Sequence, residues 1–454
     1  MKPLALLPLL ALSYLSHAQA PQPLFAQPTP AQAKADEKLF NSKAWNTPYK
    51  TNLSEDEKVA GLSKFWAEAK YNFAFFDKVP TLSWDSLYLA YLPKVRATTS
   101  MLRYYEVLQE MCAQLHDGHS NVYPPEELFA EAFEAPPVRT ALIEGKVVLT
   151  EVRSPSLRQQ GVVPGVEVLA IDGVPVRTYA QQRIAPYQSA STSQDREMRT
   201  YSARLLAGAA NQPVTLSLQD AKGRQFTRTL ARSGYSDAQS NQPPLLEVKV
   251  LKGNIGYVAL NSFADKALLT QFADAYPQLK QTKALILDVR RNGGGNSDIG
   301  FSILKYLLDK PFQTTVWHTR DYRPSYRPWE LPELWYGEAE APVSPQGATP
   351  YAGKVVVLTS ARTFSAAEDF AVAFDYAKRG LIIGEPTGGS TGQPLSFSLP
   401  GGGSARVCTK RDTYPDGKEF VGVGVQPQRV VHPTISDVRA GRDTVLESAL
   451  HEIH

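Results

Sequence analysis

Three short apolar runs in the second half of the chain most constrain its fold. They are "KALILDVR", "KVVVLTS" and "GLIIGEP", each bounded by turn residues, and the helical patterns "SDIGFSILKYLLDK" and "SAAEDFAVAFDYAKRG" separate them. Strands that are apolar throughout and alternate with helices are typical of a sheet covered on both faces. With the preceding strand pattern "NIGYVALNSF", they predict an α/β domain over residues 245–454.

Residues 137–235 alternate between apolar and polar positions instead. The runs "KVVLTEVR", "PVTLSLQD" and "QFTRTLAR" predict strands separated by Gly, Pro and Asp-Gly turns. The segment "GVVPGVEVLAIDGVPV" resembles the corresponding stretch of PDZ domains, which bind extended chain ends by adding a strand to an open sheet edge. A generic small β-module is the alternative. A PDZ-like domain would make a polypeptide, held by its C-terminal tail, the natural ligand.

A small helical domain is predicted before it, over residues 53–130. In "SEDEKVAGLSKFWAEAKYNF" the apolar residues recur at helical spacing, and Ser54 with the acids after it predicts the start. Two further helical patterns, "WDSLYLAYLPKVRAT" and "SMLRYYEVLQEMCAQLHDG", follow.

The first residues predict export. Lys2, an apolar stretch and the small residues Ser16 and Ala18 have the layout of a secretory signal over residues 1–18, too short for a stable membrane span. A core helix is the alternative, but prolines interrupt it. Residues 19–52, rich in Pro, Gln and Ala, predict a tether or a loosely packed arm. We therefore expect a periplasmic or extracellular protein.

Composition excludes several classes of partner and scaffold. A net charge of +3 over 454 residues is too small to indicate a nucleic-acid partner. Only Cys112 and Cys408 occur, so this is no disulfide scaffold. One bridge between them is possible in an oxidising compartment, but two buried free thiols are favoured.

Ser365, in "LTSARTFSAAEDFAVAF", has two interpretations. With Glu368 three residues later and an apolar run behind it, the pattern is that of a capping box, which local sequence alone favours. A serine at a strand-to-helix turn is also where hydrolases expose a nucleophile. The turn "RNGGGNSD", after another predicted strand, lacks the Walker and dinucleotide patterns. It is either a tight turn or a backbone cradle for an anion or oxyanion.

The histidines do not predict a metal site. His116 and His119 in "LHDGHSN" lack a third ligand at sensible spacing, and the terminal "HEIH" is one residue too short for a zinc-protease motif. We predict no metal and no cofactor. A histidine at a helix end can still act as a general base, because its ordinary pKa is about 6.5.

Taken together, these motifs resemble a family. "ILDVRRNGGGN", "LTSARTFSAAEDFA", "IGEPTGG" and "GVGVQP", after a PDZ-like segment and "LHDGHS", are similar to the C-terminal-processing (tail-specific) serine peptidases and the related tricorn core protease. The resemblance implies a ClpP/crotonase-like α/β sandwich with Ser365 as nucleophile. It further implies an oxyanion hole made by the N–H groups of Ala366 and of Gly294 or Gly295.

The chain departs from the processing-peptidase branch at the general base. That branch uses a lysine in "T-x-G-K-G", but the corresponding run here is "TGGSTGQ", with Ser390 nearest the lysine's place. The tricorn-like branch uses a histidine that precedes the PDZ region, which corresponds to His119, and a glutamate near the C-terminal end. Glu419 is the candidate for that glutamate, although its spacing to Gly424 differs from the tricorn one.

The resemblance thus implies an exported serine endopeptidase that hydrolyses unfolded or C-terminally exposed polypeptides through an acyl-enzyme. The alternative is a weak or inactive scaffold that binds an apolar small molecule or a peptide. An aromatic-rich, irregular insertion over residues 312–351 suits either a lid or such a binding site.

Overall fold

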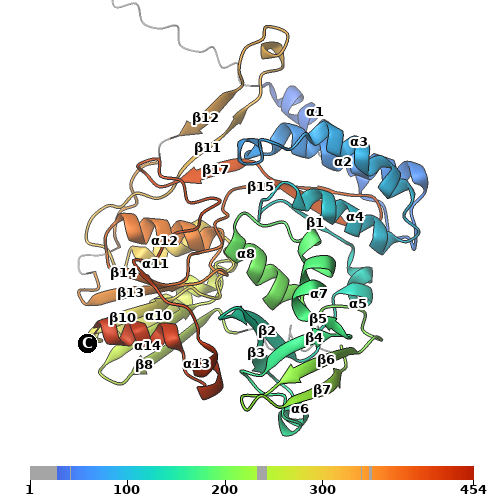
Figure 1. The fold of residues 1–454 in the computed structure, drawn as a ribbon. Coiled ribbons are helices and arrows are strands. Elements are labelled where there is room, and N and C mark those ends of the chain that lie inside the picture. Colours follow the sequence, from blue (N-terminus) through green and yellow to red (C-terminus); the bar gives the residue numbers. More distant parts are fainter. Residues whose placement is uncertain (1–27, 41, 233–242, 339, 347–349, 454) are drawn as a thin grey trace, which may run out of the picture. The chain divides into compact units, whose positions relative to one another are not determined.

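The computed structural model describes residues 28–40, 42–232, 243–338, 340–346 and 350–453 (Figure 1). The chain divides into two compact units, Met1–Trp45 and Asn46–His454. The predicted signal sequence lies outside the described residues.

The first unit contains part of the predicted tether. The structure gives it a helix, α1 (Pro30–Phe40), and a 3₁₀ helix, η1 (Lys43–Trp45). The helix forms because its sequence is rich in Ala, Lys, Glu and Gln, and because Thr29 Oγ1 accepts the N–H of Gln32 at its start. No residue of α1 is buried, so the helix has no packed face.

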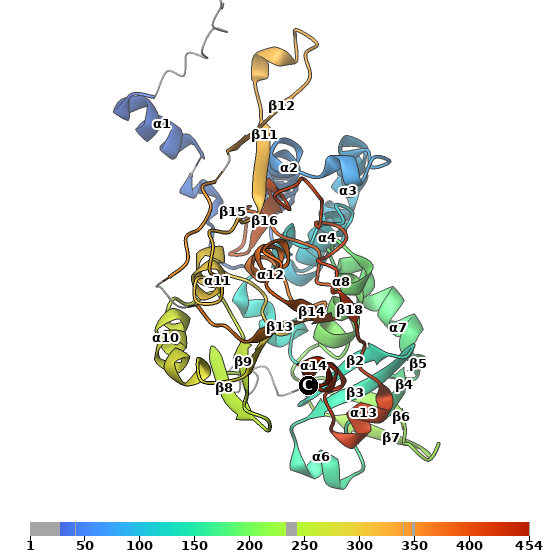
Figure 2. The same ribbon diagram turned by 90° about the vertical axis from the view of Figure 1, so that its left-hand side faces the viewer.

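A six-stranded sheet is the core of the second unit. Its order is β18-β14-β13-β10-β9-β8, and every neighbouring pair is parallel except β8 and β9. Side chains alternate between its faces: Leu285 and Leu287 pack in the core that contains α10, α11 and α12, and Ile286 packs on the opposite face with α14 (Figure 2). The predicted α/β layout is confirmed. The strands are β8 (Leu246–Leu251), β9 (Ile255–Leu260), β10 (Ala284–Asp288), β13 (Lys354–Thr359), β14 (Leu381–Gly384) and β18 (Arg429–Val430); the helices are α10 (Ala267–Leu279), α11 (Ser297–Leu304), α12 (Ala366–Tyr376), α13 (Ile435–Ala440) and α14 (Thr444–Ile453).

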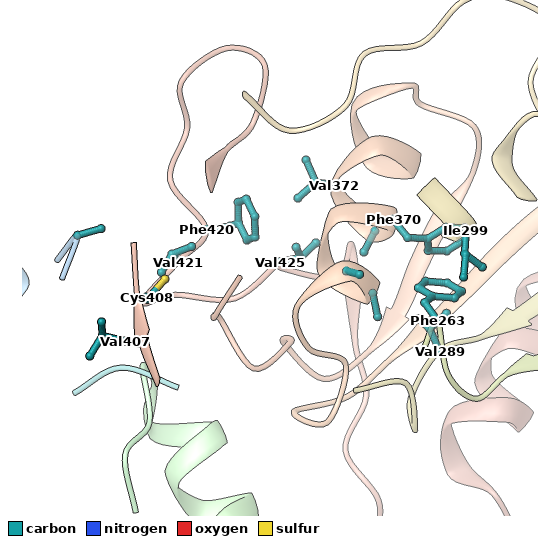
Figure 3. Close-up of a cluster of buried hydrophobic side chains, with 14 of the residues drawn as sticks. Phe263, Val289, Ile299, Phe370, Val372, Val407, Cys408, Phe420, Val421 and Val425 are labelled. Carbon is teal, nitrogen blue, oxygen red and sulfur yellow. The ribbon is translucent and has the colours of Figure 1, made fainter. Parts of the chain in front are cut away.

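Helix α12 is enclosed on all sides, with every residue from Ala366 to Asp375 buried. Figure 3 shows Phe370 and Val372 of this helix between Phe263 and Ile299 on one side and Phe420 and Val425 on the other. Burying a side chain of this size stabilises the fold by about 1.5–3 kcal/mol. Packing on all sides therefore fixes the position of the helix and of its first residue.

The N-terminal part of this unit is helical, as predicted. A capping box starts α2 (Glu55–Asn72), since Ser54 Oγ accepts the N–H of Glu57 and the Glu57 carboxylate accepts the N–H of Ser54. A three-stranded sheet of order β1-β16-β15 joins this part to the C-terminal part of the chain. The remaining elements here are η2 (Phe76–Lys78), α3 (Trp84–Arg96), α4 (Met101–Ala113), β1 (Asn121–Tyr123), η3 (Glu126–Leu128), α5 (Phe129–Ala132), β15 (Pro394–Ser398) and β16 (Ser404–Cys408).

The segment that resembles a PDZ domain forms a sheet of order β2-β3-β4-β6-β7 around a core of its own, with β5 beside β4. Strand β2 lies at one edge and pairs only with β3 among the described strands. The PDZ-like assignment and the predicted domain boundaries stay predictions. The strands are β2 (Val138–Ile143), β3 (Lys146–Val152), β4 (Glu167–Ile171), β5 (Val174–Pro175), β6 (Val214–Gln219) and β7 (Gln225–Leu230); the helices are α6 (Pro155–Gln159), α7 (Val176–Arg183), η4 (Ala185–Tyr187), α8 (Ser193–Glu197) and the π-helix η5 (Met198–Arg204).

The aromatic insertion is not irregular, and that prediction was wrong. Strands β11 (Val316–Asp321) and β12 (Leu334–Glu338) form a hairpin, with η6 (Pro324–Tyr326) near its tip, and β17 (Lys410–Thr413) pairs with β11. Cross-strand aromatic contacts such as Trp317–Tyr336 stabilise the pairing. Cys112 and Cys408 are both free and buried.

Candidate active site

Ser365 lies where two loops of the core sheet meet. Strands β10 and β13 are parallel neighbours, so the loops after Asp288 and Thr359 leave the same edge of the sheet. Hydrogen bonds join the loops: Thr363 Oγ1 donates to the carbonyl of Val289 (2.9 Å), and the N–H of Phe364 donates to that of Asn292 (3.1 Å). The site thus begins at the carboxyl ends of two strands.

The backbone of Ser365 is strained. Its φ of 57° and ψ of −131° lie outside the regions that residues other than glycine ordinarily adopt. Such a conformation costs roughly 1–3 kcal/mol. Such strain persists only where the surroundings enforce it, and it concentrates at functional sites. Here the N–H of Ser365 donates to the carbonyl of Ser390 at 3.0 Å and to the carboxylate of Glu368 at 3.2 Å.

His119 reaches this serine from the loop after α4. Its Nε2 lies 3.0 Å from Ser365 Oγ, and its Nδ1 lies 2.8 Å from Ser390 Oγ. His119 is 3% exposed, and its ring stacks on Phe364 with 4.7 Å between the ring centres. For Nε2 to accept the serine proton, Nδ1 must carry the hydrogen and donate it to Ser390. A serine, a histidine and a second serine therefore form a chain of hydrogen bonds.

The surroundings of His119 keep its ring neutral. Burial, and then the positive charges of Arg406, Arg199 and Lys410, hold its pKa well below the usual 6.5. A neutral imidazole can accept a proton, as a general base must. The segment that precedes it is held by Asp117, whose carboxylate accepts the hydroxyls of Ser120 at 2.7 Å and Ser191 at 3.3 Å.

Glu368 holds the serine turn and the loop of Ser390 together. Its carboxylate accepts the N–H groups of Gly389 (2.8 Å), Ser390 (2.9 Å) and Ser365, and the hydroxyl of Thr387. Burial raises its pKa to about 8, against these hydrogen bonds, which lower it. All four partners donate, so their hydrogen bonds favour the ionised form and oppose the larger effect of burial.

The cap and nucleophile interpretations of Ser365 are compatible. The side chain of Glu368 reaches back to the N–H of Ser365, as in a capping box, and the N–H of Glu368 donates to the carbonyl of Ser365 at 2.6 Å. The serine hydroxyl lies instead within hydrogen-bond distance of the imidazole. Glu368 caps the turn while Ser365 Oγ stays next to a base.

The structure does not bring Glu419 to His119. The carboxylate of Glu419 is about half exposed and forms ion pairs with Lys78 (2.6 Å) and Arg411 (2.8 Å), which hold its pKa below the usual value. Ser390 occupies the position on Nδ1 that an orienting acid would take. The sequence drew attention to Ser390 as the residue nearest the family lysine and to Glu368 as a helix cap, but it gave no signal for their joint role.

Of the two glycines predicted for the oxyanion hole, Gly294 lies against Ser365, and Gly295 lies against the backbone of Phe263. A side chain at Gly294, where φ is 99°, would come within 2.6 Å of Ser365 Cβ and 3.0 Å of the Ala366 nitrogen. The N–H of Gly294 already donates to Asn292 Oδ1 at 2.9 Å. Among the described residues, the N–H groups of Gly295 and Ala366 have no hydrogen-bond acceptor. The geometry therefore favours Gly295 over Gly294 as the partner of Ala366.

No group of three or more His, Cys, Asp or Glu side chains in the described ranges could hold a metal ion. None of the helices in those ranges is long and apolar enough to cross a membrane.

A comparison with known families identifies the domain in which Ser365 lies. Residues 254–431, which contain Ser365, Glu368 and Ser390, match the model of peptidase family S41. These residues form a family S41 peptidase domain. The chain is accordingly a serine-type peptidase, and the predicted family resemblance is confirmed.

Relatives and solved structures extend the likeness beyond the S41 domain. The chain is 24% identical over 431 residues to a chloroplastic C-terminal processing peptidase of Tetradesmus obliquus, covering 89% of this chain and 80% of the relative. A carboxyl-terminal-processing protease of Picosynechococcus is also 24% identical, covering 72% of each chain. Mature CPAF bound to lactacystin has the same fold at 15% identity, with a TM-score of 0.66 over 88% of this chain and 97% of that one. The photosystem II D1 C-terminal processing protease aligns with a TM-score of 0.50 at 21% identity, over 87% and 97%.

The glycine turn of the S41 domain gives a first test of the site. Gly294→Ala is expected to lower kcat/KM at least a hundredfold, because the new methyl group would collide with Ser365 and disturb the neighbouring donors. Gly293→Ala is the matched control, since nothing lies within 4 Å of the added carbon. Peptidase assays and thermal unfolding of both variants make the comparison. Wild-type activity of Gly294→Ala would contradict the assignment of this turn to the site.

Proposed function

We propose that the chain is a C-terminal-processing endopeptidase in which Ser365 is the nucleophile and His119 the general base. The observation that carries the proposal is the 3.0 Å distance between His119 Nε2 and Ser365 Oγ, two atoms that lie 246 residues apart in sequence. Serine needs an adjacent base to attack a carbonyl at neutral pH, and this pair satisfies that requirement.

The reaction follows from the positions of these groups. Nε2 takes the hydroxyl proton as Ser365 Oγ attacks the carbonyl carbon of the peptide bond. The N–H groups of Ala366 and Gly295 then stabilise the oxyanion, near the positive end of the α12 dipole. The tetrahedral intermediate collapses as His119 gives its proton to the leaving amine. Water, deprotonated by His119, attacks the acyl-enzyme and releases Ser365.

Ser390 takes the orienting role in this proposal, in place of Glu419. Its hydroxyl accepts the hydrogen of Nδ1, which selects the tautomer with a free lone pair on Nε2. Glu368 supports it by holding the backbone of Ser390. An acid therefore acts on His119 through the loop rather than by direct contact.

The substrates in this proposal are unfolded or C-terminally exposed polypeptides. The free edge of β2 supports this, because an extended tail can pair with it as an added strand. We further propose that the protein is exported, on the basis of the signal-like sequence of residues 1–18.

A fluorophosphonate probe tests the nucleophile. Such probes phosphonylate a serine that a neighbouring base activates, so the wild-type protein should carry one adduct, located on Ser365 by peptide mass spectrometry. An adduct elsewhere, or folded protein that does not react, would favour the alternative of a binding scaffold.

A further inference from the structure

A cavity lies beside the loops that lead to Gly295 and Ser365. Its volume is about 1260 Å³, more than most small-molecule pockets, and enough for a segment of extended chain. It is lined by β2 of the PDZ-like sheet, by η5, and by Arg291 and Arg362 of the S41 domain. The loops that contribute these two arginines are those that carry Gly295 and Ser365.

Positive charge exceeds negative charge at one end of this cavity. The single carboxylate of Glu151 binds both Arg153, at 2.7 Å, and Arg139, at 3.2 Å. Arg291 and Arg362 lie close enough to interact electrostatically with the same group. Four guanidinium groups therefore share one carboxylate.

Two of these cations have no partner. Within the described ranges, neither the guanidinium group of Arg291 nor that of Arg362 forms an ion pair or a hydrogen bond. Burial, and then the charges of Arg139 and Arg291, lower the pKa of Arg362, as expected of a cation held near other cations.

The other acids of the lining do not neutralise this cluster. Asp443 binds Arg290 and Glu385 binds His432. Glu144 accepts the N–H of Ile435, and Glu197 is exposed. A partly desolvated excess of arginine is stabilised by a bound anion, and guanidinium groups bind carboxylates in a planar, bidentate manner.

We propose that Arg139, Arg291 and Arg362 form a binding site for a carboxylate of the polypeptide substrate, so that the enzyme selects chains with an acidic group near the scissile bond. The proposal rests on the peptidase function above and specifies its substrate class. The carboxylate comes either from an acidic side chain or from the chain end. The two unpaired arginines belong to the loops that carry Gly295 and Ser365, so the bound carboxylate lies at the same edge of the sheet as the serine.

Binding to the Ser365→Ala protein tests the site without turnover. Four fluorescein-labelled peptides are compared, which are identical except at two positions. One internal residue is either Glu or Gln, and the C-terminus is either free or amidated. Fluorescence anisotropy gives the Kd of each peptide. The Glu peptide with a free end should bind at least about tenfold more tightly than the peptide with Gln and an amide. If replacing Glu by Gln alone weakens binding, the side-chain carboxylate is bound. If amidating the C-terminus alone weakens binding, the terminal carboxylate is bound.

Substitutions then locate the site. Arg291→Gln and Arg362→Gln should each remove this preference, whereas Arg362→Lys should retain part of it, because it keeps the charge but loses the bidentate geometry. Arg224→Gln is the matched control: Arg224 is exposed in the turn before β7, outside the cavity, and should not alter the preference.

Equal binding of all four peptides, absence of binding, or equal losses for acidic and neutral peptides would overturn the proposal. Its failure is distinguishable from failure of the peptidase function. If the protein prefers the acidic peptides but neither reacts with the probe nor cleaves peptides, the carboxylate site stands and Ser365 is rejected as nucleophile. If it reacts and cleaves but shows no preference, Ser365 stands and the carboxylate site is rejected.

Discussion

Ser365→Ala is expected to lower kcat for peptide hydrolysis by roughly 10⁴- to 10⁶-fold, the range found when a serine nucleophile is removed from comparable sites. Without Oγ no acyl-enzyme can form, and the oxyanion donors and substrate contacts supply only the residual rate. Substrate binding should be nearly unchanged, because the hydroxyl is small and its contact is with His119.

The fold should tolerate this substitution. The N–H of residue 365 would keep its bonds to Glu368 and to the carbonyl of Ser390, since both involve backbone. Steady-state kinetics with an unfolded protein substrate and thermal unfolding measure the two effects. Ser86→Ala, at an exposed position of α3, is the control and should retain full activity. Substantial turnover by Ser365→Ala would remove the basis of the proposed mechanism.

His119→Asn is expected to lower kcat by roughly 10⁴-fold. An amide cannot accept the serine proton at neutral pH, so Ser365 would remain a hydroxyl, and the leaving amine would have no proton donor. Asparagine keeps a polar side chain in the buried position between Ser365 and Ser390, which limits the loss of stability.

His116→Asn is the matched control for that experiment. His116 lies three residues earlier in the same loop, is exposed, and has a φ of 49°, which asparagine tolerates. We expect it to have nearly wild-type kinetics. A fully active His119→Asn enzyme, or equal losses in both variants, would exclude His119 as the base. Circular dichroism confirms that each variant is folded.

The sequence predicted the parts of this protein that local pattern controls. The apolar runs form β10, β13 and β14, as predicted, because parallel strands buried on both faces need no alternation of apolar and polar residues. The spacing between Ser365 and Glu368 correctly predicted the start of a helix. The pairing of His119 with Ser365 came from a family resemblance, since no local feature joins residues so far apart.

The features that the sequence did not predict correctly were missed for physical reasons. Glu419 was chosen from its position in a motif, but a motif does not show where a carboxylate points, and Lys78 comes from a distant helical segment to bind it. The β11–β12 hairpin was hidden because its partner β17 lies far along the chain and because its residues do not alternate cleanly. Ser390 was noticed as a substitute for lysine, but its contact with His119 exists only in the folded chain.

Strand β1 has a consequence for the order in which the enzyme becomes active during its synthesis. The loop of His119 leads directly into β1, which pairs with β16, where Asn121 lies opposite Arg406. A ribosome completes the loop of His119 long before it makes β16, the strand with which β1 pairs. The nascent chain therefore cannot fix the loop of His119 in this way until β16 has been made.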